Sequence, residues 1–518
     1  MPRPRLCPGL FFAVFSLFIA ACTSHSLSAP LPKPEQNSRI AVNLNPIRKL
    51  DMIFLIDNSA SMKPKQEKMA EQFPRLIDAL KDPAMTPQLP DLRIAIIDSD
   101  VGAGRSGNCM PQYGDRGRFQ MRDATCGASP GARWLEQDAS GNGNFTGDIS
   151  EVFGCLAKAV GQEGCGFEQP LQALNLALNL KDETTGKPQR SEFLRDDALL
   201  AIVLLTDEDD CSMPLESLMA QANLSATESW SLRCATRGHL CGKESLDYPT
   251  TTAFSADYDT CQARMDVCPD GETGMEPTDC SPLSDVKYLA KQIKEAKGDA
   301  SRVLVSAIFG SPRKGQATAT YRIAKVSQAG KEVFDYFPVC EDPRFPSGGR
   351  DDLAAWGMGA QGGLRIKAFL EQFPAGQTQA FSICEPDFTE AMRSIGEAIA
   401  LQLGKPCLPR KLQDTNLDLP GLQPDCDVRL RVDGILSEEL PYCSDREGRK
   451  PCWKVVTDAD RCPAITSAEG NVFPSQFVAV ERAGGAAPAP DEFLEMNCLT
   501  CTDLRKPFQT GYTIPGCQ

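Results

Sequence analysis

The sequence predicts an α/β protein with a doubly wound, mostly parallel β-sheet, followed by a small β-rich domain held together by disulfides. Short apolar runs of strand length alternate with stretches of helical period, which is the pattern of repeated βαβ units. Residues 405–518 instead combine short alternating runs with eight of the 22 cysteines, as is typical of a small disulfide-bonded domain. With 518 residues, 42% of them hydrophobic and 24% charged, the chain has enough apolar material for a large core.

Apolar runs and helical periodicity place the elements of the sheet domain in order along the chain. The runs expected to form buried strands are residues 52–56, 92–97, 199–205 and 303–308. Helical spacing of apolar side chains predicts helices over residues 67–80, 171–180, 285–297, 364–373 and 388–403. Helices that alternate with strands supply the crossover connections that parallel strands require.

Two long interruptions break this alternation. Residues 102–144 are rich in glycine and contain two cysteines, and residues 211–280 contain six cysteines with little periodicity. Because unstapled loops of this length are unusual in a compact domain, we expect disulfide-stapled insertions. Residues 51–404 contain 12 cysteines and residues 405–518 contain 8, and both counts are even, which favours a domain boundary near Gly404.

The N-terminus has the features of a bacterial export signal. A basic start and an apolar run over residues 10–21 end at Ile19-Ala20-Ala21-Cys22, and this run is too short to span a bilayer. The last four residues resemble a lipobox, which implies cleavage after residue 21 and acylation of Cys22; an ordinary signal peptide is the alternative. Thr23, where an inner-membrane retention signal has Asp, favours an outer-membrane lipoprotein, with its face of the membrane left open. Residues 22–50 are expected to form the tether.

Charge and composition exclude several functions. A net charge of −15 argues against a nucleic-acid-binding surface, and two histidines are too few for a multi-histidine metal site. The number of cysteines indicates an oxidising compartment. No other segment is long and apolar enough to span a bilayer, so the lipid on Cys22 is the one membrane attachment that we expect.

The residues that follow the first strand carry the candidate chemistry. Asp57, Ser59 and Ser61 alternate along a tight loop at the carboxyl end of that strand, where open parallel sheets bind their ligands. One carboxylate and two hydroxyls are hard oxygen donors with little total charge. Such a set suits Mg2+, which takes six oxygen ligands and keeps several waters.

This loop and a second element resemble the metal-ion-dependent adhesion site of von Willebrand factor type A (VWA) domains. The first is Asp57-x-Ser59-x-Ser61, and the second is Thr206-Asp207 at the end of the strand at residues 199–205. The resemblance covers roughly residues 51–404 and extends to bacterial VWA lipoproteins of unassigned function. It implies that Ser59 and Ser61 bind Mg2+ (or Ca2+ or Mn2+) directly, while Asp57 and Asp207 act through metal-bound water. One position would stay open for a carboxylate of a protein partner or other ligand, as in cell adhesion.

One loop departs from the family pattern. Where the family has a metal-binding Thr, this chain has Cys165, within the segment Gly164-Cys165-Gly166-Phe167-Glu168-Gln169. A cysteine in a disulfide is a poor Mg2+ ligand, so Glu168 is the candidate replacement. The extra carboxylate would make the site more negative and more tolerant of Ca2+.

Other polar motifs receive structural interpretations. We expect Glu208, Asp209 and Asp210 to form a solvated acidic rim. We assign Cys498-Leu-Thr-Cys501 to the disulfide framework, because it lacks the second Cys pair or nearby histidine of a zinc site. A serine hydrolase is disfavoured because the folded region has a single histidine, His239, and no Gly-x-Ser-x-Gly element.

The sequence therefore predicts a binding protein and not an enzyme. Its leading function is divalent-metal-dependent binding of a carboxylate-bearing partner. Two alternatives stay open: a structural envelope protein whose metal only stabilises the loop, and a metal-dependent hydrolase that uses Asp57, Asp207 and Glu168.

Overall fold

The computed structural model describes most of the chain beyond residue 36. The described residues are 37–43, 49–81, 89–102, 109–110, 114–119, 121, 123–182, 185–214, 230–242, 255–258, 260–268, 280–298, 300–314, 319–328, 331–342, 359–374, 376–403, 408, 411–432, 435–443, 449–457, 465–466, 472–473, 476–485 and 492–501. The expected signal peptide, the lipobox with Cys22 and the first part of the tether lie outside them. None of the described helices combines the length and apolar character needed to cross a membrane.

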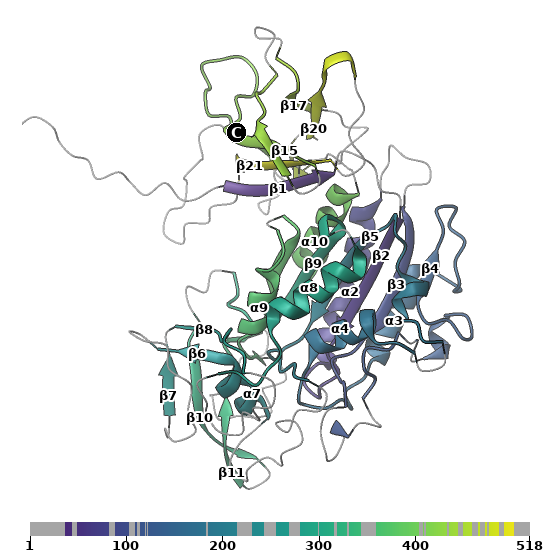
Figure 1. Ribbon diagram of the computed structural model, residues 1–518, viewed down its shortest axis with the longest axis vertical. Coiled ribbons are helices and arrows are strands. Elements are labelled where there is room, and N and C mark those ends of the chain that lie inside the picture. Colours follow the sequence, from purple (N-terminus) through teal and green to yellow (C-terminus); the bar gives the residue numbers. More distant parts are fainter. Residues whose placement is uncertain are drawn as a thin grey trace, which may run out of the picture. The chain divides into compact units, whose positions relative to one another are not determined.

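A six-stranded mixed sheet forms the centre of the α/β region, with the strand order β14-β9-β5-β2-β3-β4 (Figure 1). Its neighbouring strands run parallel except β3 and β4, which pair antiparallel at one edge. The strands are β2 (Lys49–Ile56), β3 (Asp91–Ile97), β4 (Leu135–Gln137), β5 (Leu199–Leu205), β9 (Val303–Phe309) and β14 (Thr378–Ser382). The four strands predicted from apolar runs are confirmed, and β4 and β14 were not predicted.

Helices pack on both faces of this sheet. Side chains alternate along β2, so that Phe54 lies in one core cluster and Ile53 and Leu55 lie in the other. The first cluster includes side chains of α2 (Lys63–Leu80), α3 (Ile149–Ala159) and α10 (Thr389–Gln402). The second includes side chains of α4 (Pro170–Asn179), α8 (Val286–Lys297) and α9 (Leu364–Leu370). Buried apolar side chains thus cover both faces of the sheet, and the loops at its edges start from this packed core.

The two insertions are stapled, as expected. In the first, Cys109 pairs with Cys165 and Cys126 pairs with Cys155. This insertion also contains β4 and the 3-10 turn η2 (Ala124–Cys126). In the second, all six cysteines pair within the insertion: Cys211–Cys234, Cys241–Cys261 and Cys268–Cys280. With Cys340–Cys384, the 12 cysteines of residues 51–404 are all paired with one another.

The second insertion also contains regular structure that the periodicity did not reveal. It holds α7 (Trp230–Gly238), β6 (His239–Cys241), β7 (Ser255–Tyr258) and β8 (Cys261–Ala263). β6 pairs with β8, and β7 joins a sheet with β10 (Tyr321–Gln328) and β11 (Lys331–Tyr336). One short further pair joins β12 (Cys340–Glu341) to β13 (Gly359–Ala360). β6, β8, β12 and β13 have only two or three residues each, too few for a sequence period to register, whereas β10 and β11 are of ordinary length and were not predicted.

The C-terminal segment is β-rich and disulfide-bonded, as predicted. Its strands are β15 (Cys426–Val432), β16 (Ile435–Glu439), β17 (Cys452–Thr457), β18 (Ile465–Thr466), β19 (Val472–Phe473), β20 (Gln476–Glu481) and β21 (Phe493–Leu499). Cys426 pairs with Cys498 and Cys443 with Cys452, so the Cys-x-x-Cys cysteine at 498 is part of the disulfide framework.

Two parts of the segment expected as a tether, residues 22–50, lie in strands. β1 (Asn37–Asn43) is a strand beside β21 in the four-stranded sheet β1-β21-β15-β16. β2 begins at Lys49, three residues before the predicted apolar run, because backbone pairing with β3 starts there. A strand added at a sheet edge takes its stability from main-chain hydrogen bonds, which need no marked apolar pattern.

Candidate metal centre

Two neighbouring strands bring the two predicted acidic elements to one edge of the sheet. β2 and β5 are parallel, with Ile56 opposite Leu205, and the Asp57 amide donates to the Leu205 carbonyl over 2.9 Å. Asp57 and Thr206-Asp207 therefore leave the sheet at the same level. The structure brings together the residues that the sequence placed at this edge, as expected where parallel strands end.

The Asp57 carboxylate is fully buried and held by two hydrogen bonds. The Thr206 hydroxyl donates to Oδ2 and the Ser59 amide donates to Oδ1, each over 2.7 Å. Burial raises the pKa of Asp57 to about 6, and the negative charge of Asp207 adds to the rise. A cation at this edge would offset both effects.

The two serines of the loop have the spacing of neighbouring ligands. Ser59 Oγ and Ser61 Oγ lie 3.3 Å apart, and each is the hydrogen-bond partner of the other. In an octahedral Mg2+ site with bonds near 2.1 Å, adjacent oxygens lie about 3 Å apart. The hydroxyl pair therefore fits two adjacent positions around one small ion with little movement.

Glu168 is buried near the same edge with its oxygens unused. It is 1% exposed, and among the described residues neither carboxyl oxygen has a hydrogen-bond partner. Burial raises the pKa of Glu168 well above its usual range, and the charges of Asp57 and Glu208 add to the rise. Asp207 Oδ1 is also buried without a partner. Buried oxygens with unused lone pairs are available as ligand atoms for a cation.

The three acids of this edge do not converge on one point. Among the residues that the structure describes, Cys443, Cys452 and Glu481 alone form a group of three His, Cys, Asp or Glu with ligand atoms all within 4.8 Å of one another. Those two cysteines are bonded to each other, so they offer no thiolate. Asp57, Asp207 and Glu168 do not form such a group, so their carboxylate oxygens do not all lie close enough together to bind one ion directly.

Cys165 cannot replace the metal-binding Thr of the family pattern. Its sulfur is bonded to Cys109, and its amide donates to Asp100 Oδ2 over 3.1 Å. The donors at this edge are therefore the two serine hydroxyls and the buried carboxylates.

Two features of the site were not predicted. Lys65 is buried and its ammonium group pairs with Asp207. Asp98 and Asp100 follow β3 at the same edge, and Asp98 Oδ2 accepts from Asn58 Nδ2 over 3.2 Å. The position of Asp98 and Asp100 directly after an apolar strand is the signal that could have identified them. Nothing in the sequence marks Lys65, because one lysine in an amphipathic helix predicts a solvated side chain.

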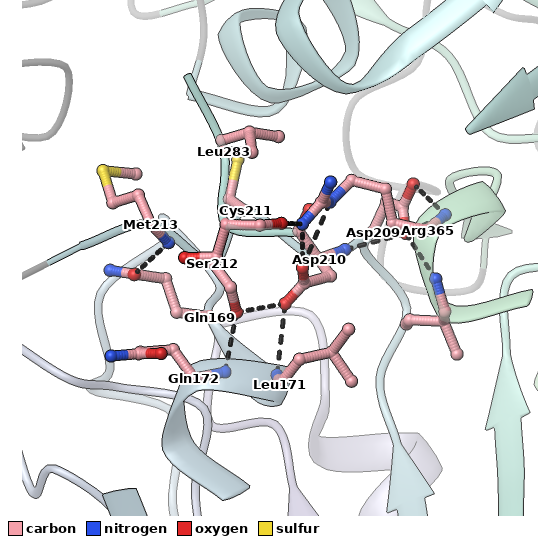
Figure 2. Close-up of polar contacts among 12 residues, drawn as sticks. Gln169, Leu171, Gln172, Asp209, Asp210, Cys211, Ser212, Met213, Leu283 and Arg365 are labelled. Carbon is pink, nitrogen blue, oxygen red and sulfur yellow. Dashed lines mark hydrogen bonds and ion pairs between the residues drawn. The ribbon is translucent and has the colours of Figure 1, made fainter. Parts of the chain in front are cut away.

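Asp209 and Asp210 do not belong to a solvated rim (Figure 2), and Glu208, the third acid expected there, is partly buried. Asp210 is fully buried and pairs with Arg365, 3.0 Å from Nη2 to Oδ2, while its Oδ1 accepts from the Leu171 amide over 3.1 Å. Asp209 is also buried, and its carboxylate accepts from the amides of Arg365 and Ile366 at the start of α9. These two carboxylates fix the ends of α4 and α9, a role that depends on distant residues and was invisible in the sequence.

His239 is part of this anchoring. It is fully buried, and its Nε2 lies 2.6 Å from Asp209 Oδ2. It lines a small pocket together with Glu168, Glu208 and Tyr336. Among the described residues, the hydrogen-bond partner of Ser59 Oγ is Ser61 and not His239, so the structure offers no serine–histidine pair.

Comparisons with known proteins identify no family. No family model matches the chain, and no curated protein does. Among solved structures, the pilus adhesin SpaC from Lactobacillus rhamnosus GG in its open conformation is 9% identical, with a TM-score of 0.29 over 88% of this chain and 39% of that one. The pilus adhesin RrgA from Streptococcus pneumoniae is 11% identical, with a TM-score of 0.23 over 90% of this chain and 58% of that one.

These similarities carry little weight. The chain spans less than two thirds of the length of each adhesin that it matches. TM-scores this low establish neither a shared fold nor a shared function. The interpretation of the site therefore depends on its own residues.

Proposed function

We propose that this protein binds a divalent cation, foremost Mg2+, at the edge formed by Asp57 and Asp207, and through it a carboxylate-bearing partner. The observation that carries the proposal is the pair of serine hydroxyls 3.3 Å apart beside a fully buried Asp57. The buried oxygens of Glu168 and Asp207 Oδ1 are compatible with it, because among the described residues they have no hydrogen-bond partner and could accept a cation.

The residues have distinct roles in this proposal. Ser59 and Ser61 bind the ion directly with neutral oxygens. Asp57, held by Thr206 and the Ser59 amide, orients metal-bound water, and so does Asp207. Neutral direct ligands leave most of the positive charge of the ion uncompensated, so the ion attracts an incoming Asp or Glu side chain. Glu168 adds negative charge, which favours Ca2+ or Mn2+ as alternatives.

We also propose that the sheet region has a type A-like fold. A type A-like arrangement is supported by the sheet order, with the antiparallel strand β4 at its edge, and by the Asp-x-Ser-x-Ser loop after the central strand β2. We also propose that Cys22 is acylated and anchors the protein in the outer membrane. An adhesion-type role at the cell envelope would combine these two proposals.

The test is a calorimetric titration of the exported, disulfide-bonded protein with Mg2+, Mn2+ and Ca2+. Saturable binding to the wild type that is lost in Asp57→Ala supports the site. Asp427→Ala is the matched control, because Asp427 is half-exposed and pairs only locally with Arg429. No binding by a correctly folded wild type would refute the proposed function.

A second experiment separates binding from mere stabilisation. A peptide with an exposed Asp is compared with its Asn counterpart, with and without EDTA. Binding that requires both the carboxylate and the ion supports the proposal. Partner binding that survives EDTA would instead indicate a structural envelope protein whose metal stabilises the loop.

A further inference from the structure

Lys65 places a positive charge inside the proposed metal centre. It lies near the start of α2, four residues after Ser61, and is 2% exposed. Its ammonium group pairs with Asp207 Oδ2 and donates to the carbonyl oxygens of Gly359 over 3.0 Å and Ser61 over 3.3 Å. The three acceptors match the three donors of an ammonium group.

The placement of this charge is costly without its partners. A lysine taken out of water loses its hydration, and only well-placed acceptors compensate for the loss. Here the main partner is Asp207, one of the two acids assigned to the ion. Lys65 donates to Oδ2 of Asp207, while Oδ1 is buried and has no hydrogen-bond partner in the described part of the chain. One carboxylate therefore faces a resident cation on one oxygen and has its other oxygen available.

We propose that Lys65 is a built-in competitor of the divalent ion, and that its ammonium group sets how strongly the site binds that ion. This inference rests on the proposed function. With the ion absent, Lys65 neutralises Asp207 and keeps the edge folded. When the ion binds at Ser59 and Ser61, it competes with the ammonium group of Lys65 for the carboxylate of Asp207, and the two positive charges repel each other. Lys65 thereby weakens the binding of the ion and makes the ion-free state stable.

The same helix provides a matched control. Lys68 is also buried, and its ammonium group lies 3.2 Å from Asp342 Oδ2 and donates to the carbonyls of Ile383 and Glu385. None of these partners belongs to the proposed centre. Lys68→Met therefore removes a buried lysine from α2 without changing the charge at Asp207.

The experiment is calorimetric titration of the full, disulfide-bonded protein with MgCl2 alone. We expect Lys65→Met to bind Mg2+ at least about tenfold more tightly than the wild type, because the change removes the repulsion between two like charges at the same carboxylate. Lys68→Met should bind like the wild type. Thermal unfolding adds a second readout: Mg2+ should raise the Tm of Lys65→Met more than that of the wild type.

Two further variants separate the effect of the charge from an effect on folding. Lys65→Gln keeps hydrogen-bond donors for Gly359 but removes the charge, so it should bind Mg2+ more tightly than the wild type. Lys65→Arg keeps the charge and should not. If Lys65→Met and Lys65→Gln, both folded by near-UV circular dichroism, bind Mg2+ no more tightly than the wild type, the inference is overturned.

The outcomes also separate this inference from the proposed function. Equal affinity of wild type and variants refutes the role of Lys65 alone. Binding by the Lys65 variants and none by the wild type supports Lys65 as a complete substitute for the ion, and refutes metal-dependent function of the native chain. No binding by any folded protein refutes both.

Discussion

Two pairs of acids, adjacent in the sequence or at the same edge of the sheet, behave in opposite ways in this protein. Asp209 and Asp210 are buried with their oxygens occupied by Arg365, backbone amides and His239. Asp57 and Asp207 are equally buried, but among the described residues Asp207 Oδ1 has no hydrogen-bond partner. Burial raises the pKa of Asp57 and of Asp210 alike, so the difference between the pairs lies in the partners of their oxygens. The first pair is part of the framework, and the second has capacity for a ligand.

The difference shows that a count of acidic residues does not identify a cation site. Residues 207–210 form one run of four acids, yet Asp209 and Asp210 have their oxygens occupied by Arg365, backbone amides and His239, whereas the charge of Asp207 acts on Asp57. What distinguishes a candidate site is the balance between buried charge and the partners that compensate it. The predictions below test this contrast by removing partners from one pair and charge from the other.

The largest effect is expected from the framework pair. Arg365→Met leaves the fully buried Asp210 without its counter-charge, and loss of one partner of a buried pair costs about 3–5 kcal/mol. Chemical denaturation measures this loss. Arg393→Met is the control, because Arg393 and its partner Glu397 are exposed and such a pair contributes only about 0–1 kcal/mol. Similar losses for the two variants would mean that Asp210 is stabilised without Arg365.

The second effect concerns the ion and not the fold. Asp57→Asn keeps the shape of the side chain but removes the charge that orients metal-bound water. Loss of such an indirect partner is expected to weaken Mg2+ binding about 10- to 100-fold. The stability of the ion-free protein at pH 7 should not fall, because a carboxylate with a raised pKa opposes folding when it is ionised. A strongly destabilised Asp57→Asn would show that Asp57 belongs to the framework.

The third prediction is the pH dependence of the ion-free protein. The pKa of Asp57 is about 6 in the folded state and 3.8 ordinarily, so the folded state binds this proton more tightly than the unfolded chain does. Its contribution to stability is therefore greatest below about pH 4 and is lost as the pH rises through about 6. Unfolding in EDTA between pH 4 and pH 7 should show this slope in the wild type and a flatter one in Asp57→Asn. Parallel curves would contradict the assignment.

The smallest effect is expected at Glu168. Burial raises the pKa of Glu168 well above its usual range, so its ionised form is disfavoured in the ion-free protein. Glu168→Gln should lower Ca2+ affinity by a few-fold and Mg2+ affinity less, because the larger ion accepts more carboxylate ligands. Paired titrations with the two ions measure the ratio. An unchanged ratio would exclude Glu168 from the site.

The sequence predicted the central sheet better than its edges. β2, β3, β5 and β9 are buried on both faces and therefore consist of apolar residues that stand out in the sequence. The edge strand β14 (Thr378–Ser382) is partly exposed and mostly polar, so it has no such pattern. β1 was missed for a related reason, because an edge strand depends on backbone pairing with β21.

The candidate site shows the same division. Asp57, Ser59, Ser61 and Asp207 could be placed from local sequence, since each follows directly from where a strand ends. Lys65, Arg365 and His239 could not, because their roles depend on partners more than a hundred residues away or on the insertion. Local patterns locate the ends of strands, whereas compensation of buried charge is a property of the folded chain.

The most direct test of the central claim is anomalous diffraction from crystals of the protein soaked in Mn2+. We expect a single peak within bonding distance of Ser59 Oγ and Ser61 Oγ, and none beside Asp209 and Asp210. Absence of a peak at the serines, or a peak at the Asp209–Asp210 cluster instead, would contradict it.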